Sequence, residues 1–164
     1  MSGYSLIFEQ DLCVGCHACE IACKQEYDIP VGPRWMQVIP RGPDEVGGKL
    51  VLTFQNIRCM HCGKPPCINA CPVGAITRRG DGIVLINPDL CIACKACIEA
   101  CPFAAPQFNL EKNVVEKCTL CEHRLSKSLE PACTLVCPTG AIRFGGIHGL
   151  TRTLGKRRAK ISTP

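Results

Sequence analysis

The stretch Cys91-Ile-Ala-Cys94-Lys-Ala-Cys97-Ile-Glu-Ala-Cys101-Pro102 decides the fold of this chain. It spaces four cysteines as C-x2-C-x2-C-x3-C and follows them with a proline. Thiolate is a soft ligand, and a tight loop carrying three thiolates can wrap one face of an iron–sulfur cube. The spacing predicts a [4Fe–4S] site, because zinc usually takes two separated pairs of ligands and a disulfide framework needs no proline.

The fourth cysteine of the run indicates a second cluster. Cys97 and Cys101 lie four residues apart, which in a helix separates their Cα atoms by about 6 Å along the axis. One helical turn would then join two cubes with centres about 10–12 Å apart. The pattern predicts crossed ligation, in which the fourth cysteine of each group binds the other group's cluster.

The run is one of four cysteine groups in a chain of 164 residues with sixteen cysteines. An internal repeat of this kind takes precedence over local propensity in predicting a fold. No cysteine is left over, so four complete sets predict four [4Fe–4S] clusters. The groups are Cys13, Cys16, Cys19 and Cys23; Cys59, Cys62, Cys67 and Cys71; Cys91, Cys94, Cys97 and Cys101; and Cys118, Cys121, Cys133 and Cys137.

Composition agrees with an inorganic interior. Hydrophobic residues make up 46% of the chain, but this figure includes the cysteines, and aromatic residues make up only 5%. An ordinary apolar core would be small, so folding is expected to be coupled to metal binding. We therefore predict an α+β fold in which short β-hairpins and short helices wrap around the clusters, in two units that each hold two.

Charge and hydropathy restrict the partners. The formal net charge is +5, but each four-thiolate cube adds about −2, so the loaded protein is expected to be slightly acidic and to bind no nucleic acid. The sequence contains no run of 18 apolar residues, so no transmembrane helix is predicted, and membrane contact would go through a partner. The first residues show neither a secretory pattern nor a twin-arginine signal, which favours a cytoplasmic location.

The longest interval without cysteine predicts an inserted hairpin. Residues 35–39 and 49–54 resemble strands, and residues 41–48 contain the Gly and Pro typical of a loop and turn. The hairpin could cover a cluster or dock a partner. Cover is favoured, because a lone tryptophan such as Trp35 is more often packed than functional.

Shorter elements are expected between the groups. Lys24 stands where the other groups have proline, so the first group's helix can continue past Cys23. A strand is predicted at 4–8, two further hairpins at 75–86 and 106–117, and a short helix at 122–129.

Basic side chains next to the cysteines could raise cluster potentials or could be solvated surface charges, and both interpretations stay open. They are Lys24, Lys64, Lys95 and Lys117. The histidines are not expected to be ligands, because each cluster already has four cysteines. They are His17, His61, His123 and His148.

The groups can pair in a nested or in a serial way. The second and third groups are separated by 19 residues that span one hairpin. Because short connections join neighbours in space, these two favour one inner unit, and groups one and four then pair around it. The nested division gives an outer unit of 1–58 and 102–146 with a hairpin insertion at 30–55, an inner unit of 59–101 and a basic tail of 147–164.

Nested pairing with crossed ligation predicts four ligand sets, each with three cysteines of one group and the last of its partner group. The sets are Cys13, Cys16, Cys19 and Cys137; Cys118, Cys121, Cys133 and Cys23; Cys59, Cys62, Cys67 and Cys101; and Cys91, Cys94, Cys97 and Cys71. We call them the first, second, third and fourth sets.

The order of the groups, the wide gap in the last one, and two further strings resemble a known family. The strings are Cys101-Pro-Phe-Ala-Ala-Pro-Gln-Phe-Asn109 and Glu116-Lys-Cys-Thr-Leu-Cys121. Residues 4–145 resemble the four-cluster iron–sulfur subunits that accompany molybdenum or tungsten pterin oxidoreductases, which include those of the dimethyl sulfoxide reductase group. Similar small proteins serve tungsten aldehyde oxidoreductases and class II benzoyl-CoA reductases. In this family the nested pairing is the rule.

The resemblance implies an electron-transfer subunit without a catalytic site of its own. The short chain resembles the small cytoplasmic subunits of tungsten enzymes, so the expected partner is a large tungsten or molybdenum pterin subunit of the aldehyde oxidoreductase type. A flavin subunit using NAD, or a soluble ferredoxin, would be the second redox partner. The alternatives are a subunit of a dimethyl sulfoxide reductase group enzyme, and a free polyferredoxin or self-associating wire that uses the basic tail.

Overall fold

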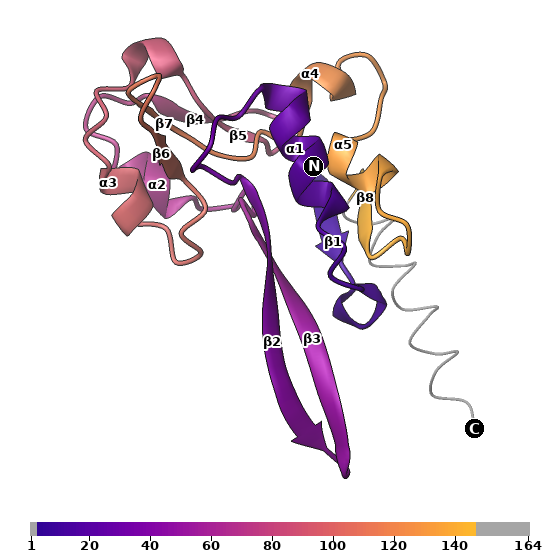
Figure 1. Cartoon of the computed structure of the whole chain (residues 1–164). Helices are drawn as coiled ribbons and strands as arrows, with labels where there is room; N and C mark the ends of the chain where they lie inside the picture. Colours follow the sequence, from indigo (N-terminus) through magenta and orange to yellow (C-terminus); the bar gives the residue numbers. More distant parts are fainter. Residues whose placement is uncertain (1–2, 147–164) are drawn as a thin grey trace.

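The computed structural model describes residues 3–146, and the predicted basic tail lies outside this range. Within it, the chain forms four two-stranded antiparallel sheets joined by short helices and loops (Figure 1). No helix of residues 3–146 has the length and apolarity needed to cross a membrane. The fold is therefore a small mixed assembly of strands and helices.

The elements alternate along the chain with the cysteine groups. The strands are β1 (Tyr4–Phe8), β2 (Met36–Val46), β3 (Lys49–Arg58), β4 (Ile76–Arg78), β5 (Val84–Ile86), β6 (Gln107–Asn109), β7 (Val114–Glu116) and β8 (Ile142–Gly146). The helices are α1 (Ala18–Tyr27), α2 (Pro66–Asn69), α3 (Ala96–Glu99), α4 (Glu122–Leu125) and α5 (Ala132–Leu135), with short 3-10 turns η1 (Gln10–Leu12) and η2 (Pro88–Leu90). The strand predicted at 4–8 and the hairpins predicted within 75–86 and 106–117 are confirmed.

The first and last strands pair with each other. In the β1–β8 sheet, Tyr4 lies opposite Gly146 and Phe8 opposite Ile142 (Figure 1). The rings of Tyr4 and Phe144 stack with centroids 5.2 Å apart. Helix α1 packs against α5 beside this sheet. The first and fourth cysteine groups are thereby brought together across the length of the chain.

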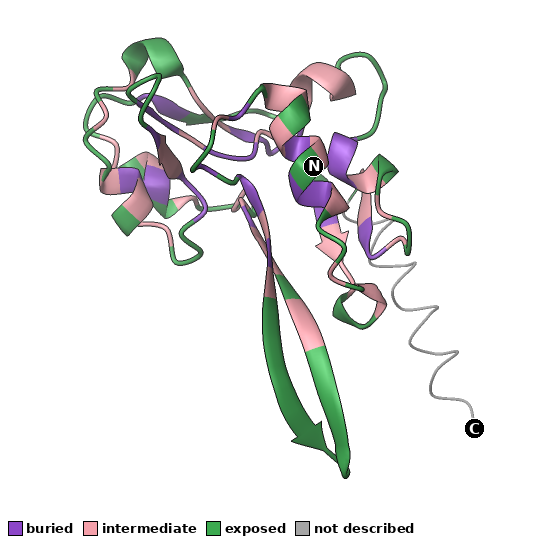
Figure 2. Cartoon of the chain, in the orientation of Figure 1, coloured by how far each residue is buried: buried purple, intermediate pink, exposed green. Residues whose placement is uncertain are grey.

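Two buried clusters of side chains form the core, and both contain thiols. One combines Leu6, Trp35, Ile83 and Ile142 with cysteines of the first and fourth groups. The other combines Ile76, Val84 and Val115 with Cys67 and Cys97 of the second and third groups. Figure 2 shows the buried residues confined to the body of the molecule. The apolar core is small, as the composition predicts.

The β2–β3 hairpin is longer than predicted. The expectation of a loop over 41–48 is wrong for its first part, since β2 continues to Val46, with a register shift between Arg41 and Asp44. At the base of the hairpin, Trp35, Met36 and Val38 are buried. The distal half extends away from the body and is exposed (Figures 1 and 2). The base of the hairpin therefore covers the core that contains cysteines of the first and fourth groups, and the distal half does not.

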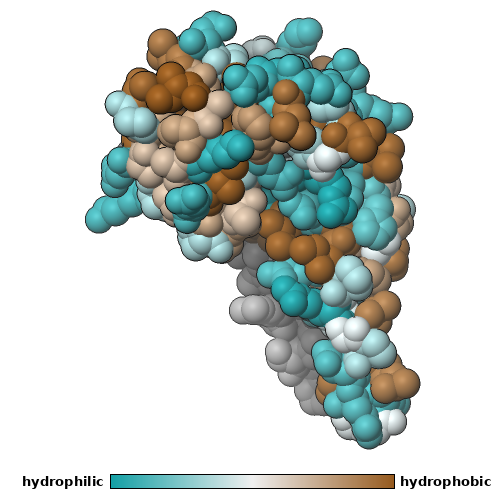
Figure 3. All heavy atoms as spheres, turned by 60° about the vertical axis from the view of Figure 1, so that its left-hand side comes forward, coloured by the Kyte–Doolittle hydropathy of each residue, from teal (hydrophilic) through white to brown (hydrophobic). Residues whose placement is uncertain are grey.

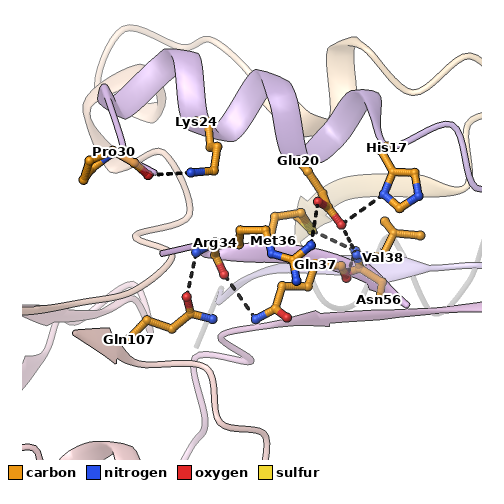
Figure 4. Close-up of polar contacts among 10 residues, drawn as sticks. All are labelled: His17, Glu20, Lys24, Pro30, Arg34, Met36, Gln37, Val38, Asn56 and Gln107. Atoms are coloured by element: carbon orange, nitrogen blue, oxygen red, sulfur yellow. Dashed lines mark hydrogen bonds and ion pairs between the residues drawn. The ribbon is translucent and has the colours of Figure 1, made fainter. Parts of the chain in front are cut away.

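Glu20 ties the base of the hairpin to α1 (Figure 4). Its side chain is buried, and its carboxylate accepts the backbone N–H of Val38. The same carboxylate lies 3.3 Å from Nδ1 of His17 and 3.5 Å from Nη1 of Arg34. Because Glu20 follows Cys19 directly, these contacts also hold the first cysteine group in place.

Helix α1 continues past its last cysteine, as predicted. It runs to Tyr27, whereas each of the other four α-helices in the described residues has four residues. Lys24 supplies a backbone N–H where the other groups have proline, and its Nζ donates to the carbonyl of Pro30 at 2.6 Å. The additional turn holds Tyr27, whose ring lies 4.6 Å from that of Trp35.

We expect Lys24→Pro to break α1 at this point. Proline removes a helical hydrogen bond and clashes with the preceding turn, which costs about 3 kcal/mol or more. The free energy of unfolding, measured by circular dichroism in denaturant under anaerobic conditions, should fall by that amount. Lys24→Ala is the matched control, since it removes the side chain but keeps the backbone N–H. Equal stability of the two variants would contradict this account of the helix.

Candidate cluster-binding sites

The four cysteine loops share one backbone feature. The residue two positions after the first cysteine has a left-handed conformation in every group: Gly15 (φ 66°), His61 (φ 46°), Ala93 (φ 55°) and Leu120 (φ 59°). Three of these residues are not glycine, so the conformation costs energy that the fold must supply. Turns of this kind direct successive backbone N–H groups into a concavity that binds anions, including iron–sulfur clusters.

Backbone N–H groups also reach the sulfur atoms. The amide of Ala75 donates to Sγ of Cys71 at 3.3 Å, and the amide of Leu120 donates to Sγ of Cys118 at 3.4 Å. At Cys137 burial acts to raise the pKa, but backbone N–H groups and the Thr139 side chain outweigh it and lower the pKa overall. The loops are therefore arranged to stabilise thiolates.

Two cavities are each lined by four cysteines from two different groups. One is lined by Cys59, Cys62, Cys67 and Cys101. The other is lined by Cys71, Cys91, Cys94 and Cys97. These are the third and fourth sets, with each group's last cysteine facing the other group's loop. The donor set fits a four-thiolate cluster.

The thiols of the second set are buried together. Cys23, Cys118, Cys121 and Cys133 are all buried. Burial, and after it the charges of Cys118, Cys133 and Cys121, raises the pKa of the Cys23 thiol. The last cysteine of the first group therefore faces the loop of the fourth group.

The first set is partly exposed. The charges of Cys16 and Cys13 act on Cys19, although burial and the charge of Glu20 contribute more to its raised pKa. Cys13 and Cys137 both pack against the buried core that contains Cys19. The structure thus places all four thiols of this set around the same region of the molecule.

Neighbouring sets are in contact in one continuous order, which we call the line. Cys19 of the first set and Cys23 of the second lie one helical turn apart on α1. Cys59 of the third set packs against the buried cluster that contains Cys118 of the second. Cys67 of the third set and Cys97 of the fourth belong to the other buried cluster. The order along the line is therefore first, second, third and fourth.

The thiols are grouped without converging on single points. Among residues 3–146, no three His, Cys, Asp or Glu side chains are close enough to hold one metal ion.

The lysines that flank the cysteines differ in how far they are buried. Lys117 is 2% exposed, whereas Lys64 and Lys95 are exposed. Nζ of Lys95 lies 4.0 Å above the ring of Phe108. Sequence reasoning missed Arg58, which is 4% exposed. The available signal was its position directly before a group's first cysteine, which Lys117 also occupies.

The described histidines have partners other than thiols. His17 contacts Glu20, and Nε2 of His123 lies 2.7 Å from Oε1 of Glu26. Nδ1 of His61 accepts the backbone N–H of Val84 at 3.0 Å. His148 lies outside the described residues. Nε2 of His61 is buried without a hydrogen-bond partner in the described part of the chain. That no histidine replaces a cysteine ligand stays a prediction.

The thiol-lined sites define this chain as an iron–sulfur protein. Residues 50–147 match the 4Fe-4S dicluster domain family, and residues 12–75 match a second family of that description. The chain therefore belongs to the 4Fe-4S dicluster proteins. Two dicluster matches and sixteen cysteines correspond to four [4Fe–4S] clusters.

Three relatives cover most of the chain. It is 37% identical to a Halobacterium salinarum protein named as a dimethyl sulfoxide reductase iron-sulfur subunit, over 99% of this chain and 73% of the relative. It is 39% identical to the thiosulfate reductase electron transfer subunit PhsB of Salmonella typhi, over 87% of this chain and 75% of the relative. It is 40% identical to a polysulfide reductase polypeptide of Wolinella succinogenes, over 98% of this chain and 85% of the relative.

We expect cluster retention to fall as the pH falls. Burial is the main cause that raises the pKa values of Cys19, Cys97 and Cys118 to about 11, so without a cluster these groups are neutral thiols at pH 7. Because a cluster binds thiolates, loading releases protons and is favoured by rising pH. The iron retained per chain after anaerobic incubation at pH 6, 7 and 8 should increase with pH. Retention that is constant or greatest at pH 6 would contradict this linkage.

Proposed function

We propose that this protein is an electron-transfer subunit that passes single electrons through four [4Fe–4S] clusters. One observation carries the proposal: the four sets of thiols follow one another in one line, and the exposed thiols, Cys16 and Cys94, belong to its two ends. A bound [4Fe–4S] cluster supplies one-electron redox chemistry. Thiols that are buried or half-buried in the middle of the line, with one exposed thiol at each end, suit a relay that exchanges electrons with partners at both ends.

We assign all sixteen cysteines as ligands in the four sets predicted from the sequence. The two cysteine-lined cavities support the third and fourth sets. The surroundings of Cys23 support the second set, and the packing of Cys13, Cys19 and Cys137 supports the first. The assignment implies the nested division into an outer unit of 1–58 and 102–146 and an inner unit of 59–101.

Apolar side chains next to the exposed thiols are suited to docking. Ile92 and Leu90 near Cys94 are 60% and 51% exposed, and Val14 beside Cys16 is 60% exposed. Figure 3 shows separate apolar patches among hydrophilic residues on the face that includes the α2–α3 region. Both ends of the line therefore offer apolar surface where a partner could exclude water from the path of the electron.

The proposed partner is a large molybdenum or tungsten pterin catalytic subunit. The three relatives are named for dimethyl sulfoxide, thiosulfate and polysulfide reductases. These names favour the dimethyl sulfoxide reductase group at least as well as the aldehyde oxidoreductase type expected from the sequence. The second redox partner, self-association through 147–164 and the cytoplasmic location stay predictions from the sequence.

Anaerobic purification of the native complex tests the proposal. We expect about sixteen irons per chain, a broad visible absorption that dithionite bleaches, and a co-purifying large subunit that contains molybdenum or tungsten. The reduced chain should transfer electrons to that subunit in a stopped-flow experiment. A folded, colourless protein, or a fully loaded chain that purifies alone as a monomer, would contradict it.

The crossed assignment can be tested separately with cysteine variants. Cys19 and Cys23 lie one helical turn apart on α1 but are assigned to different sets. We expect Cys23→Ser to alter the same electron paramagnetic resonance (EPR) signal as Cys118→Ser, because both would change the second set. Cys19→Ser should alter a different signal. If Cys23→Ser and Cys19→Ser instead changed the same signal, both cysteines would bind one cluster and the crossed ligation would be wrong.

A further inference from the structure

Two buried cations stand at equivalent positions in the repeat. Arg58 directly precedes the first cysteine of the second group, and Lys117 directly precedes that of the fourth. They are 4% and 2% exposed. The first and third groups have Leu12 and Leu90 at the same position. The cations therefore accompany only the second and third ligand sets, which occupy the middle of the line.

Arg58 is held by neutral oxygen atoms. Its Nη1 donates to Oδ1 of Asn56 and its Nη2 to the carbonyl of Leu6, each at 2.6 Å. Its Nε is buried without a hydrogen-bond partner in the described part of the chain. Arg58 lines a pocket with Cys59 of the third set and with Leu120, which lies two residues after Cys118 of the second set. The guanidinium therefore lies beside both middle sets.

Lys117 is held in the same manner between the second and third sets. Its Nζ donates to the carbonyl of Val84 and, at 3.2 Å, to that of Cys118. It also lines the cavity formed by the third set. Its charge acts to lower the pKa values of Cys62, Cys67 and Cys118. None of the ion pairs found within residues 3–146 includes Lys117 or Arg58.

Both cations act on one small region. Val84 accepts a hydrogen bond from Nζ of Lys117 and donates its own N–H to Nδ1 of His61. His61 in turn lines one pocket together with Arg58. A buried charge without a counter-charge is strongly unfavourable. Two such charges next to thiols require a compensating negative group, and a four-thiolate cluster of net charge about −2 provides one.

We propose that Arg58 and Lys117 are the fixed counter-charges of the two middle clusters and raise their reduction potentials above those that the ligands alone would set. The inference rests on the proposed function and deepens it. When one electron passes between neighbouring clusters, the donor cluster loses one electron and the charge of the acceptor cluster becomes more negative by one unit. No proton moves. The nearby cations stabilise that added charge. At the first set the buried carboxylate of Glu20 lies beside Cys19 and has the opposite effect.

A redox titration followed by EPR on the full chain tests this inference. We expect Arg58→Gln and Lys117→Gln each to lower the midpoint potentials of two of the four clusters. The ratio of oxidised to reduced cluster at a given potential should change at least tenfold, which is 59 mV for one electron. Arg58→Lys and Lys117→Arg keep the charge and should stay near the wild-type potentials. Lys64→Gln removes an exposed charge two residues after Cys62 and is the matched control.

Each result decides the question. Unchanged potentials in both Gln variants at full iron content, or an equal shift in Lys64→Gln, would overturn the proposed role. If a Gln variant loses iron, the charge-retaining variant decides: full iron there supports a counter-charge, and the same loss indicates packing alone. A wild-type chain that lacks four clusters would contradict the proposed function itself, so the two failures are distinguishable.

Discussion

The structure depends on pairs of cysteines placed one helical turn apart at the ends of short helices. A turn of helix is a rigid spacer, so it sets how far apart two clusters can lie. On α1 the spacer joins Cys19 to Cys23, and their surroundings belong to different thiol groups. Helices α1, α2, α3 and α5 each place two cysteines one turn apart in this way. The small sheets and the thin apolar core mainly position these spacers.

Concentrating thiolates in a small interior creates an electrostatic problem. Three features compensate the repulsion between thiolates. Left-handed loop residues direct N–H groups inward, amides donate directly to sulfur, and two cations are buried in the middle of the line. Because the fold fixes these groups in place, they can stabilise negative charge with little rearrangement. Glu20 works against this trend, since its carboxylate is needed to join α1 to β2.

The cysteine pattern predicted the thiol groups because metal ligation imposes strict spacing, and each loop folds locally. The continuation of α1 past Cys23 was also predictable, since a missing proline has a local effect. The β2–β3 hairpin was not. Gly42 and Pro43 resemble a loop in sequence, but the exposed strand accommodates them at an irregularity in its register. Arg58 was missed because a basic residue beside a motif is usually solvated.

The sequence by itself determined the number of clusters, the cysteines that could hold them and the short elements between the groups, because these depend on spacing along the chain. Only the tertiary structure decided which thiols face one another, that the two ends of the line are exposed, and that Arg58 and Lys117 lie buried between the middle sets. Those properties depend on contacts between distant residues, such as the pairing of β1 with β8. Local spacing contains no information about burial, and burial determines whether a charge acts on a cluster or is screened by water.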